Sequence, residues 1–212
     1  MSALIGNEAT WYLMRASGFV ALLLVTASTA LGIAGVGRWQ RGRWTRTVGL
    51  IVHRDASLLA VVFIALHVLS AVTDSYVSVP ASASVVPWTS GYDPLWVGLG
   101  ALSLDLVLAV VATSLLRDRI GRRAWRAVHW LSYASLPVAV VHSVGAGSGA
   151  GADTGAAWST AVYLAVGLAF ALAVAARLRM RRRPDDLAPL ASPPTVATRR
   201  REAAGPAPRS TW

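Results

Sequence analysis

Five apolar stretches constrain what this chain can fold into more than any other feature of its sequence. Each is long enough to cross a bilayer with a hydrocarbon core of about 30 Å, which takes about 20 helical residues. The stretches are residues 11–35, 48–72, 95–116, 125–144 and 158–178. Tryptophans lie near their ends, as is typical of membrane–water interfaces: Trp11, Trp44, Trp96, Trp125 and Trp158. Because 55% of the residues are hydrophobic and only 14% are charged, we predict an all-α integral membrane protein, a five-helix transmembrane bundle.

Arginine positions predict how this bundle is oriented in the membrane. Twenty arginines and no lysine give a net charge of +10. They are concentrated in the first and third loops and after the last stretch, whereas the second and fourth loops contain none. Because basic residues are enriched in cytoplasmic loops, we expect these loops and the C-terminus to be cytoplasmic and the N-terminus to be outside. The same rule explains the basic charge without a nucleic-acid partner.

The two ends of the chain lie outside the predicted membrane domain, which spans residues 11–178. Residues 1–10 are expected to form a short extracytoplasmic N-terminus. Residues 179–212 are rich in Pro, Ala and Arg and are expected to form a disordered cytoplasmic tail. A cleaved signal peptide is an alternative for the first stretch, but no arginine precedes Arg15 and the stretch is long for such a signal.

All four histidines of the chain lie inside two of the apolar stretches, at matching depths. His53 and His129 lie near the cytoplasmic ends of the second and fourth stretches, and His67 and His142 lie near the outer ends. The separation within each stretch corresponds to roughly 20 Å along a helix. One metal ion cannot bridge that distance, but two sites, each with one histidine from each helix, are possible.

Two imidazoles facing each other suit the axial positions of haem, an arrangement that favours electron transfer over oxygen binding. The chain has no cysteine, which excludes iron–sulfur clusters, zinc-thiolate sites and covalently attached c-type haem. The alternative is four core histidines that are hydrogen-bonded to backbone or hydroxyl groups. Matched depths of all four within membrane segments favour the ligand interpretation, because polar groups there are costly.

Helical rotation supports one histidine pair better than the other. At about 100° per residue, the separation of His53 and His67 returns to within about 40° of the same helix face. The separation of His129 and His142, shorter by one residue, misses the same face by about 140°. Pro137 lies between His129 and His142 and is a candidate for changing the winding of that span.

Several motifs resemble the ferric reductase-like transmembrane domain, a family that includes NADPH oxidases, iron reductases and the haem-binding membrane subunit of a periplasmic methionine sulfoxide reductase. The run "GRRAWRAVHWLSYA" (121–134) resembles the family's sequence before the third ligand, and "WYLMRASG" (11–18) resembles the opening of the span before the first histidine pair. The spacings His-x13-His and His-x12-His also resemble the family. The resemblance covers about residues 10–178.

This resemblance implies two b-type haems, the inner one bound by His53 and His129 and the outer one by His67 and His142. Arg15 lies inside the first stretch near its outer end. It either extends to the membrane interface or, as the resemblance also suggests, binds the propionates of the outer haem. Three glycines could let helices or a porphyrin approach closely, although glycine is common in membrane helices: Gly18, Gly32 and Gly35.

The chain departs from fuller members of the family, which have six spans and a C-terminal FAD/NADPH module. No G-x-G-x-x-G motif precedes a predicted helix, so we expect no FAD or NADPH site within this chain. We therefore expect an electron-transfer subunit of an oxidoreductase system in the cell membrane. A separate flavoprotein reductase or quinol would donate electrons, and an extracytoplasmic acceptor would take them. The alternatives are a quinol-oxidising cytochrome b-like subunit and a haem-free transporter or structural subunit.

Overall fold

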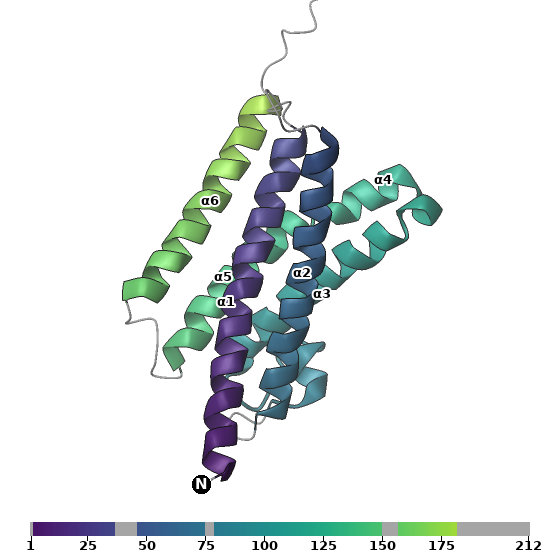
Figure 1. Ribbon diagram of the computed structural model, residues 1–212. Helices are drawn as coiled ribbons and strands as arrows, with labels where there is room; N and C mark the ends of the chain where they lie inside the picture. Colours follow the sequence, from purple (N-terminus) through teal and green to yellow (C-terminus); the bar gives the residue numbers. More distant parts are fainter. Residues whose placement is uncertain (1, 37–45, 75–78, 150–156, 182–212) are drawn as a thin grey trace, which may run out of the picture. The chain divides into compact units, whose positions relative to one another are not determined.

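The computed structural model describes residues 2–36, 46–74, 79–149 and 157–181, and its regular structure there is entirely helical (Figure 1). The helices are α1 (Ser2–Val36), α2 (Arg46–Thr73), the short 3₁₀ helix η1 (Ala81–Ser84), α3 (Pro94–Leu115), α4 (Arg117–His129), α5 (Ser132–Gly149) and α6 (Ala157–Arg181). The chain divides into two compact units, Met1–Ala175 and Ala176–Trp212. The four histidines all belong to the first unit. Of the predicted disordered tail, everything from residue 182 onward lies outside the described residues.

Four described helices are long and apolar enough to cross a membrane, and they confirm the prediction of an all-α membrane protein. The candidate spans are Ala9–Gly35 in α1, Thr47–Thr73 in α2, Pro94–Leu115 in α3 and Ala157–Arg179 in α6. They coincide closely with four of the five predicted stretches. Large apolar side chains along them are exposed, as expected of surfaces that face lipid: Leu23, Val62, Leu108 and Leu172 are examples.

The remaining predicted span, residues 125–144, is divided between α4 and α5, so a count of five spanning helices is not confirmed. At the junction the Leu131 amide donates to the Val128 carbonyl at 2.8 Å, and the Ala134 amide donates to the Leu131 carbonyl at 2.9 Å. Such three-residue spacing turns the chain by about 120° per residue instead of about 100°. This extra rotation reduces the angle by which His142 would miss the face of His129 in a regular α-helix. Pro137 lies inside α5 without ending it.

The helices of the first unit pack together through apolar side chains and small residues. In Figure 1, α1 lies beside α2, and α3 also packs against α5 and α4. Leu22, Leu136 and Val166 are almost fully buried and form a core cluster where α1, α5 and α6 meet. Between α3 and α5, the buried Ser103 hydroxyl donates to the Ser135 carbonyl at 3.1 Å. These contacts hold the histidine-bearing helices α2, α4 and α5 against α1 and α3.

Candidate functional site

The four histidine rings lie in two pairs. The ring centroids of His53 and His129 are 6.4 Å apart with their planes at 73°, and those of His67 and His142 are 6.2 Å apart at 77°. These are the two pairs that matched depth predicts. Two metal–imidazole bonds of about 2 Å, with about 1 Å from each nitrogen to its ring centre, add to about 6 Å. The spacing of both pairs therefore suits a metal between the rings.

Three of the four rings are oriented by a backbone carbonyl on a neighbouring helix. The contacts are His67 Nδ1 to the Met14 oxygen at 2.7 Å, His142 Nδ1 to the Trp96 oxygen at 2.7 Å and His53 Nδ1 to the Ser28 oxygen at 2.9 Å. Because a carbonyl oxygen can only accept a hydrogen bond, Nδ1 carries the proton in each ring. In a neutral imidazole this leaves the Nε2 lone pair for a metal, as in most metal-binding histidines.

A glycine follows each of these carbonyls by one helical turn, and the histidine ring packs against it. A Cβ at Gly18 would lie 2.9 Å from His67 Nδ1, and one at Gly100 would lie 2.7 Å from His142 Cε1. At Gly32 the Cβ would lie 3.3 Å from His53 Cε1. A side chain at these positions would crowd the ring that reaches the carbonyl one turn earlier. We refer to each such arrangement as a carbonyl–glycine contact.

His129 is held differently. Its Nδ1 is buried and has no hydrogen-bond partner within the described part of the chain. Its ring instead lies against Trp125, with centroids 5.0 Å apart and planes at 32°. The Trp125 indole N–H donates to the Ser114 hydroxyl at 3.3 Å.

Ser114 occupies an informative position on α3. On α1, Gly18 and Gly32 are separated by a certain number of residues. On α3, Gly100 and Ser114 are separated by the same number. A serine therefore stands where the glycine spacing of α1 would lead one to expect a second glycine. The hydroxyl of this serine holds Trp125, and Trp125 in turn contacts His129.

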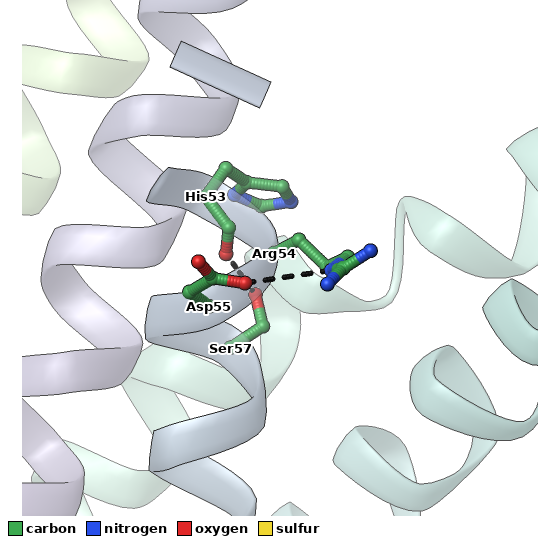
Figure 2. Close-up of polar contacts among 4 residues, drawn as sticks. All are labelled: His53, Arg54, Asp55 and Ser57. Atoms are coloured by element: carbon green, nitrogen blue, oxygen red, sulfur yellow. Dashed lines mark hydrogen bonds and ion pairs between the residues drawn. The ribbon is translucent and has the colours of Figure 1, made fainter. Parts of the chain in front are cut away.

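Two serine hydroxyl groups lie near His53. The Ser28 hydroxyl lies 3.1 Å from His53 Nδ1 and 2.6 Å from the Ser57 hydroxyl. Figure 2 shows Ser57 donating back to the His53 carbonyl at 2.7 Å and Arg54 paired with Asp55 at 3.4 Å on the same helix. The Arg54 and Asp55 side chains are 76% and 59% exposed, so their pair contributes little to stability. Sequence reasoning missed Ser28 and Ser57, because lone serines in an apolar helix carry no pattern.

A cavity of about 250 Å³ lies beside the other pair, and His67, His142 and Arg15 all line it. Most of its remaining lining is apolar and comes from α1, α2, α3 and α5. The Arg15 guanidinium also lies 4.9 Å from the centre of the Trp11 ring. An apolar cavity with two imidazoles and one cation suits a flat apolar ligand that carries acidic groups.

The number of donor atoms in each histidine pair limits the kind of metal centre that these residues could hold. Among the described residues, no group of three or more His, Cys, Asp or Glu side chains could hold a metal ion. Each histidine pair supplies two nitrogen donors on opposite sides of a gap. Iron in a porphyrin takes its other four ligands from the macrocycle. The two-nitrogen sets, and the tautomers fixed in His53, His67 and His142, therefore fit haem.

A protein-family model matches more than half of the chain. The model of a family described as "Ferric reductase like transmembrane component" matches residues 17–145. This range contains the four histidines and the three glycines of the carbonyl–glycine contacts, but it begins after Arg15 and ends before α6. It is shorter than the resemblance predicted over residues 10–178. No curated protein and no solved structure matches the chain.

Proposed function

The chain belongs to the ferric reductase-like transmembrane family, and we propose that it is a b-type cytochrome that passes electrons across the membrane through two bis-histidine haems. Family membership supports a membrane electron-transfer function. The observation that carries the finer proposal is the arrangement of two histidine pairs with ring centroids 6.4 and 6.2 Å apart. In this proposal His53 and His129 ligate one haem, and His67 and His142 ligate the other.

The histidines would bind the haem at each site and set its orientation. Nδ1–H bonds to the backbone direct Nε2 of His53, His67 and His142 toward the gap and raise the basicity of the rings. Two imidazoles at each site would complete the coordination of a haem iron, which would favour electron transfer over reaction with dioxygen. When bound, haem supplies one-electron redox chemistry. Around the His67–His142 pair, the mostly apolar lining of the cavity would exclude water.

The spacing of the histidines would place the two sites at different depths. The sequence separation of His53 and His67 on α2 corresponds to roughly 20 Å along the helix axis. By the arginine pattern, the His53–His129 site lies toward the cytoplasm and the His67–His142 site toward the outside. In this topology α4 and α5 together make the fifth crossing, and electrons move outward from one site to the next.

Arg15 would neutralise acidic groups of the outer haem. It lines the same cavity as His67 and His142, and a carboxylate in apolar surroundings needs a cation or hydrogen-bond donors. The guanidinium suits a propionate because it can donate two parallel hydrogen bonds.

Donor and acceptor would be separate molecules. A flavoprotein reductase or a quinol would supply electrons, since splitting a hydride into single electrons is a task for a flavin. An extracytoplasmic acceptor would receive them. This chain itself would bind neither FAD nor NADPH.

A haem assay on the purified full chain tests this proposal. We expect two b-type haems per chain by pyridine haemochrome analysis. The reduced-minus-oxidised spectrum should show low-spin, six-coordinate iron. A colourless protein that does not take up added haem would favour the haem-free transporter or structural alternative, and one haem per chain would refute the two-site arrangement.

A further inference from the structure

The four proposed ligands are not held equally. His53, His67 and His142 each donate from Nδ1 to a backbone carbonyl at 2.9, 2.7 and 2.7 Å. His129 Nδ1 is buried with no partner among the described residues. A metal-bound imidazole without an Nδ1 acceptor is a weaker donor, and loss of such an outer partner typically lowers metal affinity by about 10- to 100-fold.

The helix that carries His129 is also the least anchored of the helices around the two sites. His129 is the last residue of α4, which has no buried residue and is interrupted at Gly121, where φ is 79° and ψ is 155°. The 3₁₀ turn at Leu131 follows immediately. In contrast, His53, His67 and His142 lie inside continuous helices. A ligand at a helix end beside two backbone irregularities can turn away without unwinding a regular helix.

Trp125 is the one described side chain in ring contact with His129 apart from His53. It lies one turn earlier on α4 and is tied to α3 through the Ser114 hydroxyl. A tilted contact between two aromatic rings is weaker and less directional than a short hydrogen bond to a backbone carbonyl. Trp125 is therefore a positioning residue that limits how far the ring moves.

We propose that His129 is a displaceable ligand, so that the reduced His53–His129 site binds a small neutral ligand while the His67–His142 site stays closed. This inference rests on the proposed haem function. A neutral diatomic molecule is the ligand class that fits, because an ion would have to lose its hydration to enter a partly buried site between membrane helices. His53 remains bound on the opposite side, held by the Ser28 carbonyl and hydroxyl at 2.9 and 3.1 Å.

Carbon monoxide is a suitable probe because it binds reduced haem iron only where an axial position opens. The purified full chain, loaded with haem and reduced with dithionite, is mixed with carbon monoxide under anaerobic conditions. We expect one of the two haems to give a carbon monoxide difference spectrum. Two haems with no spectral change, or two that both react, would overturn this inference but not the haem function, whereas absence of haem would overturn the haem function itself.

Double variants identify which site reacts. His67→Ala combined with His142→Ala leaves the His53–His129 site, and we expect the haem retained there still to bind carbon monoxide. His53→Ala combined with His129→Ala leaves the other site, which should remain unreactive. The opposite assignment would overturn the proposal. If a double variant does not fold, the single variant Trp125→Ala assigns the site, because a changed rate of carbon monoxide binding in that variant places the reaction at His129.

A matched pair of substitutions tests the role of Trp125. Trp125→Ala removes the adjacent ring and should speed carbon monoxide binding by up to about tenfold, whereas Trp125→Phe keeps a ring and should change it little. An unchanged rate in Trp125→Ala would overturn its assignment as the positioning residue. Gly100→Ala disturbs the carbonyl–glycine contact of His142, and whatever haem the second site retains should then react as well. A second site that stays closed in that variant would contradict the idea that these contacts keep the ligands bound.

Discussion

Replacing Gly100 with alanine should selectively loosen His142. The added Cβ would lie 2.7 Å from His142 Cε1, 2.9 Å from Nδ1 and 3.1 Å from Nε2. Carbon atoms in contact normally lie about 3.5 to 4.0 Å apart, so the ring must retreat by about 1 Å. That movement lengthens the 2.7 Å bond from His142 Nδ1 to the Trp96 carbonyl to the limit of a useful hydrogen bond.

The expected cost has two parts. A lost hydrogen bond contributes about 1 kcal/mol, and overpacking contributes about 1 to 3 kcal/mol. Together these give about 2 to 4 kcal/mol, or about 30- to 1,000-fold weaker haem retention at the His67–His142 site. The less basic imidazole also donates less electron density to ferric iron, so any haem that remains should have a higher midpoint potential.

Glycines at graded distances from the histidine rings provide the controls. Gly18→Ala, with a closest approach of 2.9 Å to His67, should resemble Gly100→Ala, whereas Gly32→Ala, at 3.3 Å from His53, should have a smaller effect. Gly35→Ala meets nothing within 4 Å and should be neutral. Haem content and optical redox titration measure each variant. If Gly100→Ala keeps both haems at unchanged potentials, or if Gly35→Ala is equally damaging, the carbonyl–glycine reasoning is wrong.

Three further predictions follow from the proposed sites. His67→Ala and His142→Ala should remove one and the same spectral component, and His53→Ala and His129→Ala the other; a component shared by His53 and His67, or by His129 and His142, would contradict the pairing. Arg15→Leu should lower the midpoint potential or occupancy of the His67–His142 haem, because a nearby cation favours the reduced state, and redox titration would detect either change. NADPH alone should not reduce the haem-loaded chain, whereas an added flavoprotein reductase or quinol should; stopped-flow spectroscopy checks this, and a charge-held donor should act more slowly at high ionic strength.

Helix positions and histidine grouping could be predicted because both depend on strong, local sequence signals. Apolar runs of about 20 residues leave few options other than a membrane-spanning helix. The four histidines lie at only two depths, so the grouping of His53 with His129 and of His67 with His142 needed no tertiary information. The structure brings these rings together, while their role as haem ligands remains a prediction.

The carbonyl–glycine contacts could be predicted only in part. Gly18 and Gly32 drew notice as small residues, but a glycine in a membrane helix has many possible roles. Which backbone carbonyl a histidine reaches depends on the rotation and register of two helices, and a single helix sequence does not specify them. Gly100 was missed for this reason. The junction at Leu131 was also missed, since Pro137 was the more conspicuous candidate.

The sequence spacing of the glycines carries a signal that links these observations. Gly18 and Gly32 on α1 have the same separation as His53 and His67, their partners on α2. This shared separation completes about four helical turns, so its two ends lie on nearly the same face of a helix. Because α1 and α2 pack together and run in opposite directions, equal separations let both rings meet a glycine and a carbonyl on one face of α1.

The second pair of histidines breaks this correspondence. His129 and His142 are closer together in the sequence than His53 and His67, and a 3₁₀ turn lies between them. On α3, Gly100 is present, but Ser114 occupies the position that a second glycine would take. One histidine of this pair can therefore meet a carbonyl–glycine contact, while the other relies on Trp125. Gly100 and Ser114 therefore explain why His142 is held firmly and His129 loosely as proposed ligands.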